Sequence, residues 1–121
     1  MKKAIVFGGA GFLGSHVADS LSDAGWLVKI FDRAPSPYLR AGQEMIVGDI
    51  LDFNAVAKAA QGCQAVYQFA AVMSIDDAKR QPIDAVRINV LGTTHALEAA
   101  RLAKAERFVF ASTIYVYGRS G

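Results

Sequence analysis

This sequence of 121 residues is short of cysteine, of net charge and of long hydrophobic runs. Its one cysteine, Cys63, cannot form a disulfide within the chain, which favours a reducing compartment and a cytoplasmic location. The net charge of +2 is too small to indicate a nucleic-acid partner. No apolar run reaches the roughly 18 residues of a membrane-spanning helix, and the first residues do not resemble a signal peptide. We therefore expect neither a nucleic-acid nor a membrane partner.

Hydrophobic residues are plentiful, at 53% of the chain, and the most informative segment lies near the start. Residues 8–14 read Gly-Gly-Ala-Gly-Phe-Leu-Gly and directly follow the apolar run 4–7. Gly8 allows a sharp turn out of a strand, Gly11 lets the backbone contact a pyrophosphate, and Gly14 lets a helix pack closely. The start of that helix directs unpaired N–H groups and the positive end of its dipole at the phosphates. The segment predicts a dinucleotide-binding turn.

An acidic residue stands where such a turn requires one. Asp32 ends a second apolar run, at about the 20-residue distance typical of dinucleotide-binding proteins. Its carboxylate can accept hydrogen bonds from ribose hydroxyls and would repel a 2′-phosphate, which favours NAD over NADP. Arg33 beside it could accommodate that phosphate, so these residues leave the choice between the two cofactors open.

Strand-like and helix-like segments alternate along the chain. We expect strands at residues 3–7, 26–31, 44–47, 64–70 and 106–111. We expect helices at residues 12–24, 53–61 and 82–104, with Asp52 as an N-cap and Pro82 in the first turn of the third. Alternating strands and helices require crossover connections, so the sequence predicts an α/β protein with a parallel sheet. His16 and His95 lie at no metal-ligand spacing, and we expect packing or surface roles for both and no metal site.

The third predicted helix carries two apolar stripes. The first consists of Ile83, Val86, Val90, Leu97 and Ala100. The second consists of Ile88, Leu91 and Leu102. One stripe can pack against the sheet, so the other needs a second subunit or a further part of the protein, unless a wide stripe lies beneath a loop. From this pattern we expect a homodimer through the helix at 83–104.

Five segments, in this order, resemble the extended short-chain dehydrogenase/reductase family, which includes NAD-dependent nucleotide-sugar epimerases and dehydratases. They are residues 8–14, 48–50, 68–71, 89–93 and 112–118. The resemblance covers the chain from residue 1 to about residue 118. It implies a Rossmann-type doubly wound parallel sheet in the strand order 3-2-1-4-5, truncated before strand six. It also implies one NAD-binding domain at 1–121, without a substrate domain.

The resemblance implies cofactor contacts at individual positions. Phe12 and Leu13 would present backbone N–H groups to the pyrophosphate. Asp49 would bind the adenine amino group, with Ile50 packed on the ring. The alternative for Asp49 is a plain turn residue before the helix cap.

Further positions concern the nicotinamide half and catalysis. Ala70 and Ala71 would line the nicotinamide ribose, and Phe69 before them is a further cofactor-binding position. Thr113 matches the family's catalytic Ser/Thr, which hydrogen-bonds the substrate oxygen, and Ser112 precedes it at the end of the last strand. Asn89, in the long helix, would support the active site through the backbone and water, and both Asn89 and Ser112 count among the cofactor-binding positions. The alternatives are a local Ser-Thr turn and an ordinary helix residue.

The family's proton relay, a Tyr-x-x-x-Lys pair, is missing from this sequence. Tyr115 is followed four residues later by Arg119, which cannot act as a titratable partner. We therefore expect the chain alone to bind NAD weakly and to catalyse nothing. As part of an intact enzyme it would serve an epimerase or dehydratase acting on a nucleotide sugar. The alternatives are a non-catalytic dinucleotide-binding sensor or scaffold, a reductase of small alcohols or ketones, and a flavin or nucleoside-phosphate binder.

Overall fold

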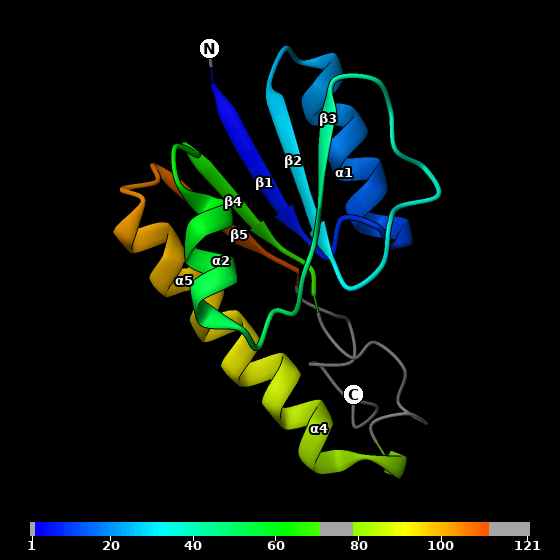
Figure 1. Ribbon diagram of the computed structural model, residues 1–121, viewed down its shortest axis with the longest axis vertical. Coiled ribbons are helices and arrows are strands. Elements are labelled where there is room, and N and C mark those ends of the chain that lie inside the picture. The colour runs from blue at the N-terminus through cyan, green and yellow to red at the C-terminus, as the bar shows by residue number, and fades with distance from the viewer. Residues whose placement is uncertain (1, 71–78, 112–121) are drawn as a thin grey trace, which may run out of the picture.

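Five parallel strands form one sheet in the order β3-β2-β1-β4-β5 (Figure 1). The computed structural model describes residues 2–70 and 79–111. The strands are β1 Lys3–Phe7, β2 Leu27–Asp32, β3 Gln43–Val47, β4 Ala65–Gln68 and β5 Arg107–Phe110. The helices are α1 Phe12–Asp23, α2 Phe53–Ala60, α4 Pro82–Val86, the π-helix η1 Arg87–Gly92 and α5 Thr93–Leu102. The predicted α/β class, Rossmann-type parallel sheet and strand order are confirmed.

The central strand β1 is covered on both faces. It pairs with β2 on one edge and with β4 on the other, so that Ile5 lies between Lys29 and Val66. Figure 1 shows α1 on one side of the sheet and α2 with α5 on the other. The α1 side buries Val6 and Ala18 together, and the α2–α5 side contains a larger apolar cluster. This double coverage explains the continuous apolar runs in the sequence.

Local signals place most element boundaries within one to three residues of their predicted positions. Gly25, in the left-handed region at φ +92°, follows the end of α1. Asp52 caps α2 as predicted, and its side chain accepts a hydrogen bond from the Ala55 N–H at 3.3 Å. None of the helices in residues 2–70 and 79–111 is long and apolar enough to cross a membrane.

The long third helix differs from its prediction, because it contains the π-helix η1 between α4 and α5. A π-turn accommodates more residues than an α-turn, so a stripe drawn at the α-helical period does not stay on one face. Neither predicted stripe packs as a unit, which corrects that expectation. The residues buried along this helix are small: Ala85, Gly92, Ala96, Ala99 and Ala100. Ile83, Val86, Val90 and Leu97, which we call the outer stripe, are 52–76% exposed.

Candidate cofactor-binding site

A pocket of about 260 Å³ opens at the carboxyl ends of β1, β2, β3 and β4. Its lining residues are Gly8, Phe31, Asp32, Arg33, Gly48, Asp49, Ile50, Phe69, Ala70 and Ile88. This edge of a parallel sheet is where proteins of this architecture bind ligands. The volume lies just below the roughly 300–1,000 Å³ of complete ligand sites, so the pocket suits one part of a larger ligand.

The glycine turn at 8–14 brings three backbone segments into close contact. Gly8 has φ +81°, and a Cβ there would lie 2.6 Å from the Ala70 nitrogen. A Cβ on Gly14 would lie 2.2 Å from the Gly8 oxygen, so α1 packs directly on the turn. Among the described residues, a Cβ at Gly11 would meet only the Gly8 oxygen, at 3.6 Å, which leaves that side of the turn open to a ligand.

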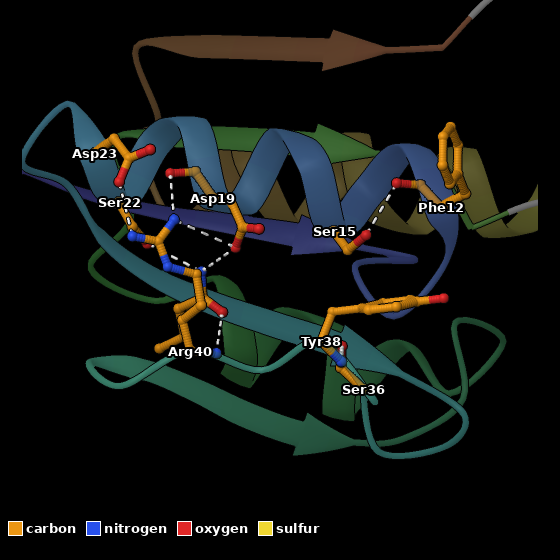
Figure 2. Close-up of polar contacts among 9 residues, drawn as sticks. Phe12, Ser15, Asp19, Ser22, Asp23, Ser36, Tyr38 and Arg40 are labelled. Carbon is orange, nitrogen blue, oxygen red and sulfur yellow. Dashed lines mark hydrogen bonds and ion pairs between the residues drawn. The ribbon is translucent and has the colours of Figure 1, made fainter.

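The start of α1 offers backbone donors that have no partner within the helix, beside this open side. The Ser15 N–H donates to the Gly11 carbonyl at 2.9 Å, so the N–H groups of Phe12, Leu13 and Gly14 precede the first intrahelical bond. The Ser15 hydroxyl donates to the Phe12 carbonyl at 2.9 Å and does not compete for these groups (Figure 2). N–H groups without an intrahelical partner and the positive end of the helix dipole suit a diphosphate.

The Asp32 carboxylate is held in place at the pocket wall. One oxygen, Oδ2, accepts a hydrogen bond from the Ala10 N–H at 2.9 Å, and Oδ1 accepts one from the Arg33 N–H at 2.7 Å. Each carboxylate oxygen can accept a second bond. The carboxylate therefore remains able to receive both hydroxyls of a ribose while the glycine turn fixes its orientation.

The loop after Arg33 is fastened along α1, as Figure 2 shows. Arg40 Nη2 lies 2.7 Å from Asp23 Oδ1, and Gln43 Nε2 donates to Asp19 and Ser22, each at 3.1 Å. The Arg40 guanidinium lowers the pKa of the Asp23 carboxyl below its ordinary value by hydrogen bonding and charge attraction. Figure 2 also shows the Tyr38 side chain directed toward the end of α1 that carries Phe12.

Asp49 and Ile50 form the wall contributed by the connection from β3 to α2. Asp49 Oδ1 accepts a hydrogen bond from the Leu51 N–H at 2.9 Å, so the turn role considered for Asp49 is present in the structure. That bond uses one carboxylate oxygen, and Asp49 still lines the pocket. Ile50 is only 4% exposed, and a Cβ on Gly92 would lie 3.0 Å from its side chain.

Gln68 and His95 support the walls of the pocket. The sequence predicted no role at this site for either of them. The Gln68 amide donates to the Ala70 carbonyl at 2.9 Å and to the Thr93 hydroxyl at 3.4 Å. His95 Nδ1 lies 2.9 Å from the Ile50 carbonyl oxygen, which makes its role more specific than the expected packing or surface role. No spacing pattern in the sequence indicates this contact, because His95 and Ile50 are 45 residues apart.

The remaining predicted positions fall into two groups. Asn89 lies in η1 beside Ile88, which lines the pocket. Ala71, Ser112 and Thr113 lie outside the described residues.

Within residues 2–70 and 79–111, no group of three or more His, Cys, Asp and Glu side chains is placed to hold a metal ion. Cys63 is buried, which raises the pKa of its thiol.

The sheet order and the glycine turn at its carboxyl edge define a Rossmann-type protein of the dinucleotide-binding class. The chain belongs to the NAD dependent epimerase/dehydratase family, whose sequence pattern matches residues 4–121. The family resemblance noted from the sequence is therefore confirmed, and the predicted cofactor, NAD, is that of the family.

Known relatives carry several activities on this scaffold. A 3 beta-hydroxysteroid dehydrogenase/Delta 5→4-isomerase of Mycobacterium tuberculosis is 38% identical, covering 92% of this chain and 31% of the relative. The human UDP-glucose 4-epimerase is 30% identical, covering 97% and 39%. The structure of MoeE5 in complex with UDP-glucose and NAD is similar with a TM-score of 0.87 at 34% identity, covering 96% and 38%. The chain thus spans about a third of the length of the relatives it matches.

Proposed function

We propose that this chain is the NAD-binding part of an NAD-dependent epimerase or dehydratase that acts on a nucleotide sugar by transient hydride transfer. The observation that carries the proposal is the pocket at the carboxyl edge, where the glycine turn, Asp32 and the Asp49–Ile50 wall meet. The human relative is a UDP-glucose 4-epimerase, and MoeE5 was solved with UDP-glucose and NAD, which supports this substrate class.

We assign the residues at the carboxyl edge of the sheet to successive parts of NAD. The open side of Gly11 and the N–H groups of Phe12 and Leu13 would hold the pyrophosphate. Asp32 would accept hydrogen bonds from the adenosine ribose. Asp49 and Ile50 would contact the adenine at the wall of the pocket.

The other half of the dinucleotide would extend along the end of β4. Phe69 and Ala70 lie there, and we propose that they line the nicotinamide ribose together with Ala71. When bound, NAD supplies the hydride acceptor for oxidation of the substrate alcohol. We assign the hydrogen bond to the substrate oxygen to the Thr113 hydroxyl, next to Ser112, with Asn89 in a supporting position.

We propose NAD rather than NADP because of the charge at the pocket wall. The Asp32 carboxylate is fixed by two backbone N–H groups, so it cannot swing away from a 2′-phosphate without losing both bonds. The repulsion between the carboxylate and a 2′-phosphate favours a cofactor that carries a hydroxyl there. Arg33 lines the same pocket and would reduce this preference, so the measured ratio of the two affinities tests the assignment.

The outer stripe supports the proposal of a homodimer through the helix at 83–104. Its four large apolar side chains are 52–76% exposed along one continuous helical segment. Several exposed large apolar side chains on one helical segment favour an interface. A second copy of the chain would cover the outer stripe with an identical stripe, since two-fold contacts pair the same surface of both subunits.

The cytoplasmic location stays a prediction from the single cysteine.

A second candidate is a dehydrogenase of small alcohols or ketones. The mycobacterial relative at 38% identity is named as a hydroxysteroid dehydrogenase and isomerase, which is the observation that favours this candidate. Both candidates use the same cofactor site. The protein with its substrate-binding part, supplied with NAD, would interconvert UDP-sugars under the first proposal and oxidise a 3β-hydroxysteroid under the second.

Titration of the 121-residue chain with NAD, NADP, FAD and ATP tests the cofactor assignment. We expect weak binding that is strongest for NAD, and no turnover of UDP-glucose by this chain, which lacks a Tyr-x-x-x-Lys pair. Tighter binding of FAD or ATP would contradict the cofactor assignment. Measurable turnover would contradict the proposed inactivity of the chain alone. Binding of NAD by the intact protein without any dehydrogenase or epimerase activity would instead support a sensor or scaffold.

A further inference from the structure

We propose that His95 is a positioning residue that holds the adenine wall of the pocket from the neighbouring helix α5. The inference rests on the proposed nucleotide site, because the wall it holds is the one formed by Asp49 and Ile50. It concerns how that wall is kept in place, which the family assignment does not address.

The connection between β3 and α2 has few anchors of its own. Gly48 N–H donates to the Asp32 carbonyl, and Asp49 closes a short turn through the N–H groups of Leu51 and Asp52, each bond at 2.9 Å. These bonds tie the connection to the end of β2 and to itself. The Ile50 carbonyl points out of this turn, and within the described part of the chain only His95 pairs with it.

The contact with His95 has a defined donor. A carbonyl oxygen only accepts, so the Nδ1 atom at 2.9 Å must carry the proton and donate it. The imidazole ring is half-buried and lies edge-on against Phe53, with ring centroids 5.4 Å apart, so it has little freedom to rotate. The hydrogen bond therefore joins a fixed side chain to a pocket wall 45 residues away in sequence.

The same helical segment also holds the side chain of Ile50. Gly92 lies one turn before His95, and a Cβ added to it would come within 3.0–3.1 Å of two Ile50 side-chain atoms. The backbone oxygen of Ile50 and its side chain are thus both fixed by one stretch of helix. Loss of the His95 bond would leave a carbonyl of a nearly buried residue unpaired and free the wall to shift.

A conservative replacement separates this role from simple packing. Asparagine carries its amide nitrogen two bonds from Cβ, as histidine carries Nδ1, so His95→Asn keeps a donor near the same position. His95→Ala removes the donor and the ring. Gln64→Ala is a matched control, because Gln64 accepts a 2.7 Å hydrogen bond from the Lys3 N–H at the opposite edge of the sheet.

The test uses AMP and NAD as probes and amide exchange as a second readout. We expect His95→Ala to raise the Kd of both probes about five- to tenfold and to speed amide exchange at Leu51 and Asp52 in the free protein. His95→Asn should restore both readouts to within about twofold, and Gln64→Ala should change neither. Unchanged exchange at Leu51 and Asp52 in His95→Ala would overturn the proposal, as would unchanged affinity for both probes. A failure of His95→Asn to restore the affinity and the exchange rates would also overturn the proposal.

The two proposals fail in different ways. If the wild-type chain binds neither AMP nor NAD, the nucleotide site is wrong. The exchange rates of the free variants then still decide whether His95 holds the wall. If the wild-type chain binds and His95→Ala binds equally well, the site stands and the positioning role does not.

Discussion

The glycine turn at 8–14 and the helical segment from α4 to α5 use small residues for the same purpose, with different results at the surface. In the turn, glycines bring backbone against backbone, as the 2.2 Å approach at Gly14 shows. In the helix, Gly92 and four alanines face the interior, and the larger residues of the outer stripe face away from it. Small residues thus allow close packing in both regions, at Gly8 and Gly14 in the turn and at Gly92 and the alanines in the helix, while Gly11 stands on the open side of the turn. We propose a cofactor for the open side of the turn and another subunit for the exposed side of the helix.

The largest expected effect comes from filling the closest approach in the turn. Gly14→Ala would place a Cβ against the Gly8 oxygen and within 2.8 Å of the Gly9 Cα. Because backbone atoms cannot yield cheaply, we expect the free energy of unfolding to fall by about 3 kcal/mol in urea denaturation. Gly11→Ala is the matched control, since its Cβ would meet only the Gly8 oxygen, at 3.6 Å, within residues 2–70 and 79–111. This variant should remain within about 1 kcal/mol of wild type. An equal fall in the free energy of unfolding for both variants would contradict the distinction between the packed side of the turn and its open side.

Charges in the outer stripe should affect assembly and leave the fold intact. Val90→Glu with Leu97→Glu places two carboxylates on a surface that is 52–62% exposed, where they cost little in the monomer. At a two-fold interface they would meet their own copies, so we expect the dimer Kd to rise at least about a hundredfold. Sedimentation would measure this, with Leu39→Glu, 43% exposed in the loop after β2, as the control. A wild-type chain that stays monomeric at high concentration would contradict the assignment of the stripe.

Removing the fixed carboxylate should have an intermediate effect. Asp32→Ala deletes an acceptor at the pocket wall, and we expect the NAD Kd to rise about tenfold, as for hydrogen bonds to a charged group. The preference for NAD over NADP should fall, because the repulsion of a 2′-phosphate disappears. Asp23→Ala removes the same charge from α1 outside the pocket and should leave both affinities unchanged. A retained preference in Asp32→Ala would locate cofactor selection elsewhere.

The smallest expected effect concerns the ion pair between the loop and α1. Arg40 and Asp23 are exposed, so Arg40→Ala should lower the melting temperature only slightly at neutral pH. Arg40 lowers the pKa of Asp23, so the stabilisation is complete above the ordinary value of 3.8 and is lost as the pH falls through the lowered value. Thermal unfolding should therefore show the wild type and Arg40→Ala converging in acid. A difference that grows in acid would contradict this sign.

The features that the sequence predicted well depend on local stereochemistry. The turn at 8–14, the cap at Asp52 and the run of β1 each follow from neighbouring residues, and the structure has them within a residue. The strand order followed from the family resemblance, since a strand pattern alone does not choose neighbours. Asp32 and Asp49 reach the same pocket because their strands are parallel neighbours.

The features that the sequence did not predict depend on contacts between distant segments. Because the long helix contains the π-helix η1, its buried face consists of small residues instead of the predicted apolar stripes. A pattern drawn at the α-helical period of about 3.6 residues does not predict such a change. Gln68 reaches Thr93 across 25 residues, and His95 reaches Ile50 across 45. Neither pair has a spacing that a sequence pattern could reveal, because each depends on how α5 packs beside the ends of the strands.

An amide chemical-shift titration of the 121-residue chain with NAD tests the central claim most directly. We expect the largest shifts on the turn at 11–14 and on the wall at 49–51, with smaller shifts on α2 and the outer stripe. A second, shallow hollow lies between α1 and Tyr67 and is lined by His16, Val17, Ser20, Leu21 and Tyr67. Shifts centred on that hollow, or no shifts at millimolar NAD, would contradict the assignment of the pocket as the NAD site.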